Sequence, residues 1–196
     1  ANCFEMADIH LVNLDEQNGR RLMLTRQLVK YITLMIHPGL VVPNDVERCM
    51  QLAYNLKYNS GCLSRQVGAI VTDSNFSVKS VGWNDVPNKQ LECIYRDVHG
   101  YCKGNQRECY SQFEYDKTLK KIFEHLDKEI SKVDLHGRKF SYCFKDIYNG
   151  WKGDKNQVFT RALHAEENAF LQISKYGGMG IEGGNLFCTA SPCELC

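Results

Sequence analysis

Two short segments near the end of the chain carry residue types that could form a catalytic metal centre. The first is His164-Ala165-Glu166, and the second is Pro192-Cys193-Glu194-Leu195-Cys196. Two cysteines three positions apart at a helix start can place both sulfurs on one cation, and a histidine at the start of a neighbouring helix can supply a third ligand. Three protein ligands leave one tetrahedral position open, which is typical of catalytic rather than structural zinc. Glu166 is well placed to move protons beside such a metal.

The combined pattern His-x-Glu…Pro-Cys-x-x-Cys is the signature of zinc-dependent nucleobase deaminases. Each half is weak alone, since a histidine and two thiols are often only buried residues, but the two halves in this order reinforce each other. The chain resembles the cytidine and deoxycytidylate deaminase superfamily from about Asn44 to Cys196. Residues 62–69, 82–87 and 189–193 resemble segments of deoxycytidylate deaminases. The resemblance is strongest to the deaminase half of bacterial antiphage deoxycytidine nucleotide deaminases.

This resemblance implies roles for the residues of the two segments. His164, Cys193 and Cys196 would hold one zinc ion, which lowers the pKa of a bound water toward ~7. Glu166 would take a proton from that water and protonate the ring nitrogen N3. Addition of hydroxide at C4 and loss of ammonia would convert a deoxycytidine nucleotide, dCMP or dCTP, into the deoxyuridine nucleotide.

Substrate contacts are implied for four further residues. The backbone N–H of Ala165 would contact the base O2, and the backbone carbonyl of Ser191 would accept a hydrogen bond from the exocyclic amine. Asn84 would contact the nucleotide, although a turn residue after a strand would also fit. Arg65 is a candidate for the phosphate because a guanidinium matches phosphate oxygens and stays charged; the alternative is a surface ion pair.

A second, structural zinc is also implied by the resemblance. Its candidate ligands lie before the first predicted strand and in the middle of the chain: Cys62, Cys93, His99, Cys102 and Cys109. The competing interpretation is a set of buried, inert thiols that stiffen a loop.

Apolar spacing predicts the elements that must position these residues. The expected order is a strand over 8–12, a helix that ends at 37–39, a helix from Asn44 to about 59, strands over 67–72 and 77–82, a helix over 164–175, a strand over 185–189 and a helix that opens at Pro192. The fold class is therefore α/β, and the resemblance implies a three-layer αβα cytidine-deaminase-like fold with a mixed sheet.

The expected domain organisation has three parts. Residues 1–40 are expected to be the tail or linker of a P-loop domain that precedes this chain, and residues 41–196 form the deaminase domain. An insertion at about 88–160 carries an amphipathic helix with apolar positions Leu119, Ile122, Phe123, Leu126, Ile130 and Val133. Because the chain begins without Met and stops on Cys196, we expect a fragment whose fold is truncated after the second zinc cysteine.

Composition excludes several classes of protein. The chain has 196 residues with ten Cys, and 24 Lys and Arg against 23 Asp and Glu give a net charge of +1. That balance gives no electrostatic footprint for duplex nucleic acid, and no apolar run reaches the ~18–20 residues of a membrane span. Without a secretory signal, metal sites or thiols are favoured over disulfides, and a cytoplasmic location is expected.

The resemblance to the deaminases also implies a homo-oligomer that acts on a small-molecule nucleotide. The alternatives are a deaminase of a base in RNA, as in tRNA adenosine deaminases, and a non-catalytic, zinc-stabilised nucleotide sensor.

Overall fold

The computed structural model describes residues 9–11, 20–104, 114, 117–153, 160–177 and 180–193. Two compact units are found, Ala1–Asn44 and Asp45–Cys196, and each is described by itself. The first unit holds α2 (Arg20–Ile36), which ends before His37-Pro38-Gly39 as predicted. Residues 9–11 are not in a strand, so this part of the strand expected over 8–12 is wrong; residues 8 and 12 lie outside the described residues. None of the described helices is long and apolar enough to cross a membrane.

The second unit is built on a three-stranded sheet with the order β2-β1-β3. Strands β1 (Gly68–Thr72) and β2 (Val78–Trp83) form the predicted hairpin, and β3 (Asn185–Cys188) pairs with the other edge of β1. Both pairs are antiparallel. The mixed sheet expected from the sequence is therefore not found among the described strands, because β3 runs in the direction that opposes β1.

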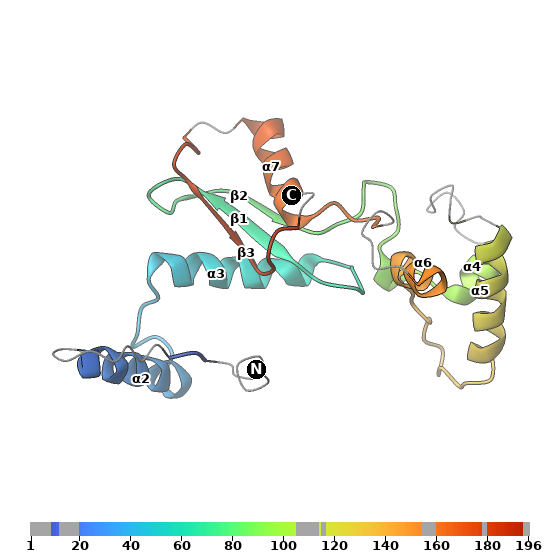
Figure 1. Ribbon diagram of the computed structural model, residues 1–196, viewed down its shortest axis with the longest axis horizontal. Helices are drawn as coiled ribbons and strands as arrows, with labels where there is room; N and C mark the ends of the chain where they lie inside the picture. Colours follow the sequence, from blue (N-terminus) through green and yellow to red (C-terminus); the bar gives the residue numbers. More distant parts are fainter. Residues whose placement is uncertain are drawn as a thin grey trace. The chain divides into compact units, whose positions relative to one another are not determined.

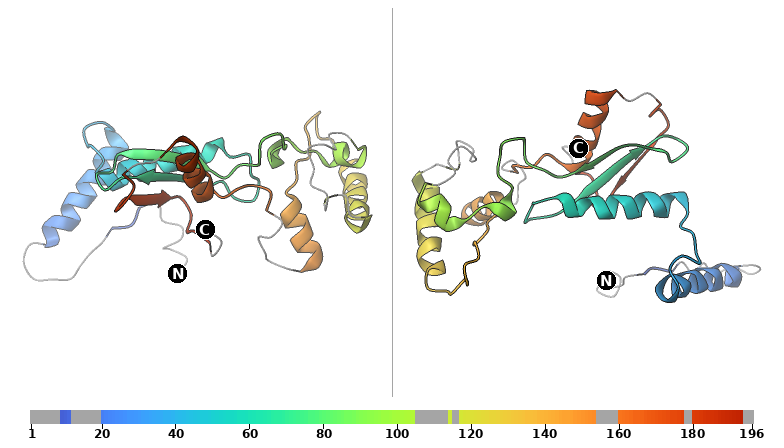
Figure 2. Two further views of the ribbon diagram at one scale, coloured as in Figure 1. Left: turned by 90° about the horizontal axis from the view of Figure 1, so that it is seen from above. Right: turned by 180° about the vertical axis from the view of Figure 1, so that it is seen from behind.

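Helices cover both faces of this sheet, which confirms the three-layer αβα arrangement (Figures 1 and 2). Helix α3 (Asp45–Leu56), followed by the short helix η1 (Lys57–Asn59), lies on one face, and α7 (Ala165–Tyr176) lies on the other. A Cβ at Gly68 would collide with the backbone of α3, and a Cβ at Gly82 would collide with the backbone of α7. Glycine at these two positions allows each helix to approach the sheet closely.

Helix α3 buries only part of its apolar side chains. Cys49 and Ala53 are completely buried beneath the sheet, together with Ile70 of β1. Val46, in the first turn of the helix, is 49% exposed.

The described residues between 93 and 152 form a helical insertion with a hydrophobic core of its own. It contains η2 (Cys93–Tyr95), α4 (Val98–Cys102), α5 (Lys117–Ile130) and α6 (Phe144–Lys152). The rings of Tyr101, Phe123 and Tyr142 pack together with centroids 4.3–6.1 Å apart. Helix α5 buries Leu119 and Phe123 as predicted, but Val133 lies beyond its end and is 61% exposed.

An ion pair is buried in the insertion. Both nitrogens of the Arg96 fork contact the Glu114 carboxylate, with Nη1–Oε1 2.5 Å and Nη2–Oε2 3.1 Å, and both side chains are fully buried. Such a bidentate pair compensates part of the cost of removing two charges from water.

The chain after β3 differs from expectation. Residues 191–193 are not helical, so the helix predicted to open at Pro192 does not begin there, and residues 194–196 lie outside the described residues.

Substitution of Gly82 by Ala tests the contact between α7 and β2. A Cβ there would overlap the Ala165 carbonyl and the Ala169 nitrogen, which are backbone atoms that cannot rotate away. We expect a loss of about 1–3 kcal/mol in the free energy of unfolding, measured by urea titration.

Gly150→Ala is the matched control for this substitution. Gly150 lies in α6, and a Cβ there would meet nothing within 4 Å. This change is expected to stabilise the protein by up to about 1 kcal/mol, since alanine favours the helix. Equal stability of the Gly82→Ala variant and the unsubstituted protein would contradict the close approach described above.

Candidate active site

The start of α7 is fixed to the end of β2 by a short antiparallel bridge. Asp85 and Leu163 exchange backbone hydrogen bonds, with N–O distances of 3.3 and 2.8 Å. His164 therefore occupies the N-cap position of α7 directly beside the sheet. Its backbone N–H donates to the Glu167 carboxylate at 2.8 Å, so the residue after the candidate catalytic glutamate caps the helix.

Asn84 organises the loop on the other side of the site. Its side-chain oxygen accepts a hydrogen bond from Val67 N–H at 2.7 Å, and its amide nitrogen donates to the Arg65 carbonyl at 2.8 Å. The residue is only 8% exposed. Asn84 thus joins the end of β2 to the segment before β1, and this role explains its burial without any ligand.

The second predicted segment is brought to the same place by Thr189. The hydroxyl of Thr189 accepts from Gly68 N–H at 3.1 Å, and the Thr189 N–H donates to the Gly68 carbonyl at 3.1 Å. These two bonds extend the pairing of β3 with β1 by one residue. The chain that follows then carries Ser191 and Cys193 toward His164.

His164 and Cys193 fit as ligands of one metal ion. The His164 Nδ1 atom lies 3.3 Å from the Cys193 Sγ atom. A zinc ion about 2.0 Å from a nitrogen and about 2.3 Å from a sulfur, in tetrahedral geometry, separates these atoms by about 3.5 Å. The imidazole and the thiol are therefore spaced as zinc requires. Cys196, the third predicted ligand, lies outside the described residues.

Glu166 is buried beside this pair and is held by a thiol. It is 5% exposed in the first turn of α7, where the helix dipole favours a negative charge. The Cys188 thiol donates to its Oε1 atom at 3.1 Å. Burial raises the pKa of Cys188 to about 12, so this thiol stays protonated and remains a donor at neutral pH.

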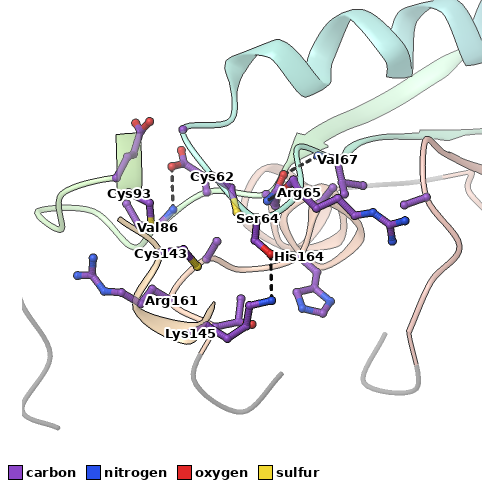
Figure 3. A pocket seen from close by; sticks show the side chains of 18 of the residues that line it. Cys62, Ser64, Arg65, Val67, Val86, Cys93, Cys143, Lys145, Arg161 and His164 are labelled. Carbon is purple, nitrogen blue, oxygen red and sulfur yellow. Dashed lines mark hydrogen bonds between the residues drawn. The ribbon is translucent and has the colours of Figure 1, made fainter. Parts of the chain in front are cut away.

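One cavity of about 340 Å³ joins these residues (Figure 3). Its wall includes all of the described residues that were predicted to act at the catalytic site: Arg65, Asn84, His164, Ala165, Glu166, Ser191 and Cys193. The cavity also reaches residues of the insertion, Cys93, Cys143, Phe144 and Lys145. The size lies within the range of small-molecule sites.

The four described residues among those predicted to bind a second zinc do not come together as one set. Among the described residues, no three His, Cys, Asp or Glu side chains form a group that could hold a metal ion. Cys62 and Cys93 line the cavity, but His99 pairs with Asp127 at 3.0 Å, and Cys102 packs against the core of the insertion. Cys109 lies outside the described residues.

Sequence reasoning missed the relation between Cys93 and Cys143. A hydrogen bond from the Cys143 thiol stabilises the thiolate of Cys93 and lowers the pKa of Cys93 to about 7, with a further contribution from Arg96. The same bond raises the pKa of Cys143. The two cysteines are 50 positions apart, and no local pattern joins them.

Residues 43–196 match the family model of the cytidine and deoxycytidylate deaminase zinc-binding region. The chain belongs to this family. The match includes the whole site and ends with Cys196, and it supports Zn²⁺ as the cofactor. Membership also confirms the superfamily that the His-x-Glu…Pro-Cys-x-x-Cys pattern indicated.

Individual relatives come from bacteriophages. The chain is 27% identical to the deoxycytidylate deaminase of Enterobacteria phage T4 over 157 residues, which cover 75% of this chain and 67% of the relative. The phage T2 enzyme is also 27% identical and is covered to 69%. Two crystal structures of the dCMP deaminase of cyanophage S-TIM5 also match, and each match covers 78% of this chain. The apo form is 23% identical with a TM-score of 0.39 and is covered to 71%. The complex with dCMP and dUMP is 25% identical with a TM-score of 0.40 and is covered to 70%.

The bond from Cys188 to Glu166 predicts how substitutions at Cys188 affect stability. Cys188→Ala removes a donor from a buried carboxylate, and we expect a loss of about 1–3 kcal/mol in the free energy of unfolding. Cys188→Ser keeps a donor and is expected to lose less, as measured by urea titration. An equal loss in both variants would show that packing, and not the hydrogen bond, determines the effect.

The lowered pKa of Cys93 predicts its reactivity. With a pKa of about 7, Cys93 is about half thiolate at pH 7, whereas burial raises the pKa of Cys102 to about 11. The rate of modification by iodoacetamide, measured by mass spectrometry of the peptides, should therefore have its pH midpoint near 7 at Cys93 and several pH units higher at Cys102, because the pH midpoint follows the pKa and not the exposure of each thiol. Cys143→Ala should slow the reaction at Cys93, and an unchanged rate would contradict the thiol pair.

Proposed function

We propose that this chain catalyses the zinc-dependent, hydrolytic deamination of a deoxycytidine nucleotide to the deoxyuridine nucleotide, with release of ammonia. The observation that carries the proposal is the convergence of His164, Cys193 and Glu166 on one cavity, with the His164 and Cys193 donor atoms 3.3 Å apart. Family membership and the phage relatives named deoxycytidylate deaminases support the same reaction class.

His164, Cys193 and Cys196 would hold the zinc ion. When bound, the ion supplies a water of lowered pKa as a nucleophile at neutral pH. The backbone of His164 is fixed at the N-cap of α7, and Cys193 follows four positions after Thr189, which is bonded to β1. Both donors are therefore anchored close to the sheet along the chain.

Glu166 is the proton carrier in this proposal. Its carboxylate accepts a proton from the attacking water and gives it to N3 of the pyrimidine, which makes C4 more electrophilic. A later proton transfer to the amino group allows ammonia to leave. The Cys188 thiol orients one oxygen of the carboxylate, so the other oxygen is available for this transfer.

The base is positioned by groups of the cavity wall. Ala165 and Ser191 belong to the residues of that wall, and we assign their backbone N–H and carbonyl groups to contacts with the base O2 and the exocyclic amine, respectively. Asn84 keeps one N–H and one lone pair beyond its two bonds to the backbone, and these remain for the nucleotide.

The monophosphate dCMP is the substrate that the phage relatives favour. The triphosphate dCTP, an upstream P-loop domain, a role in antiphage defence by nucleotide depletion, a homo-oligomeric assembly and a cytoplasmic location stay predictions from the sequence. Ammonia release from dCMP, dCTP and cytidine, measured side by side, decides the substrate.

Two other function classes are less well supported. A deaminase acting on RNA needs a basic groove for the backbone, and the net charge is only +1. A non-catalytic sensor has no use for a buried carboxylate beside the metal ligands, whereas Glu166 is buried there.

Glu166→Gln tests the mechanism. The amide cannot carry the proton, so we expect kcat for dCMP to fall by about 10²- to 10⁴-fold, with zinc content and the unfolding midpoint retained. Glu182→Gln, at an exposed glutamate, should have no effect. A Glu166→Gln variant with full activity would exclude the proposed mechanism.

A further inference from the structure

Lys145 of α6 projects from the insertion into the cavity that holds the candidate catalytic residues. Its side chain is only 13% exposed. The Nζ atom donates to the Ser64 hydroxyl at 3.0 Å and lies 3.2 Å from the Asp146 Oδ1 atom (Figure 3). Ser64 also donates to Asp146 at 3.3 Å. A cation and a hydroxyl from two different parts of the sequence are thus held together at the cavity wall.

The other two cations of the cavity wall are less suited to hold an anion inside it. Arg161 is 4% exposed, and its guanidinium donates to the Leu91 carbonyl and to Gln90, both at 2.9 Å. Its fork therefore holds the wall of the cavity. Arg65 is exposed, and its guanidinium points away from Lys145 (Figure 3).

Lys145 has the capacity to bind an anion. An ammonium group has three donors, and Ser64 and Asp146 take two. Asp146 is 51% exposed, so its attraction for Lys145 is weakened by solvent. A phosphate oxygen is charged and is therefore a stronger acceptor than a serine hydroxyl.

We propose that Lys145, with the hydroxyl of Ser64, binds the 5′-phosphate of the substrate and makes the site prefer a nucleotide over the free nucleoside. This inference rests on the proposed deamination of a deoxycytidine nucleotide. It assigns to the insertion a part of substrate selection, in the place for which the sequence had suggested Arg65 alone.

The test compares dCMP with deoxycytidine in the full zinc-loaded chain. Unsubstituted protein should have a higher kcat/KM for dCMP. Lys145→Met should lower kcat/KM for dCMP by about 10- to 100-fold, the size expected for loss of a hydrogen bond to a charged group, and change the value for deoxycytidine less than about twofold. Lys145→Arg should restore part of the activity on dCMP.

Lys152→Met is the matched control, since Lys152 lies on the same helix, is exposed and is not part of the cavity wall. It should leave both substrates unaffected. An equal loss on dCMP and deoxycytidine in Lys145→Met would show a structural role and overturn the inference. So would an unchanged preference for dCMP.

Binding of the product dUMP, measured by calorimetry, separates this inference from the proposed function. If the unsubstituted protein releases no ammonia from any cytidine compound, the proposed function fails. The phosphate site then still stands if dUMP binds more tightly than deoxyuridine and Lys145→Met removes that difference. Equal affinity for dUMP and deoxyuridine, or no binding of either, overturns the site.

Discussion

Helix α7 lies on β2 with Ala165 and Ala169 against Gly82, and no side chain separates the two backbones there. This contact brings the first turn of α7, with His164 at its cap and Glu166 in the turn, down to the level of the sheet. The Asn168 side chain adds a hydrogen bond to the Trp83 carbonyl at 3.0 Å. Strand β3 pairs with the edge of β1 that is opposite to β2. The segment after β3 therefore reaches the start of α7, where Cys193 meets His164.

Local sequence patterns were sufficient to predict most of this core. A buried apolar run followed by turn residues predicted the hairpin β1–β2, helical spacing predicted α3 and α5, and the glycines at its end bounded the helix α7. The pairing of His164 with Cys193 came from the deaminase signature and agrees with the 3.3 Å distance between their donor atoms. The prediction of a helix that opens at Pro192 was wrong over the described residues. A proline at a tolerated first-turn position permits a helix but does not enforce one.

The interactions that sequence reasoning missed all join residues far apart in the chain. Cys188 of β3 was assigned no role from the sequence, yet its thiol donates to Glu166 of α7, 22 positions away. Cys143 contacts Cys93, and Lys145 contacts Ser64, 81 positions away. Such pairs depend on where segments far apart in the chain meet in the fold. The periodicity within one segment does not indicate this position. Only the fold brings these residues together.

The electrostatics of the cavity wall also depend on the insertion. Glu114 pairs with Arg96, and its Oε1 atom lies 3.6 Å from the Arg161 Nε atom, so one buried carboxylate faces two guanidinium groups. The positive charges of Arg96 and Arg161 contribute to the lowered pKa of Cys93. A thiolate is the form that binds metals. Its lowered pKa therefore gives Cys93 the protonation state of a metal ligand, although the other described residues predicted for the second zinc do not surround it.

The net charge of the whole chain is a poor guide to the ligand that the site binds. A balance of +1 argues against a long polyanion, because many phosphates require many cations on one face. A single nucleotide phosphate requires only one or two donors, and at physiological salt a charge acts over about 8 Å. One lysine with its side chain 13% exposed in the cavity wall therefore affects such a ligand more than the sum of all surface charges. The composition that argues against nucleic acid is thus fully compatible with a free nucleotide.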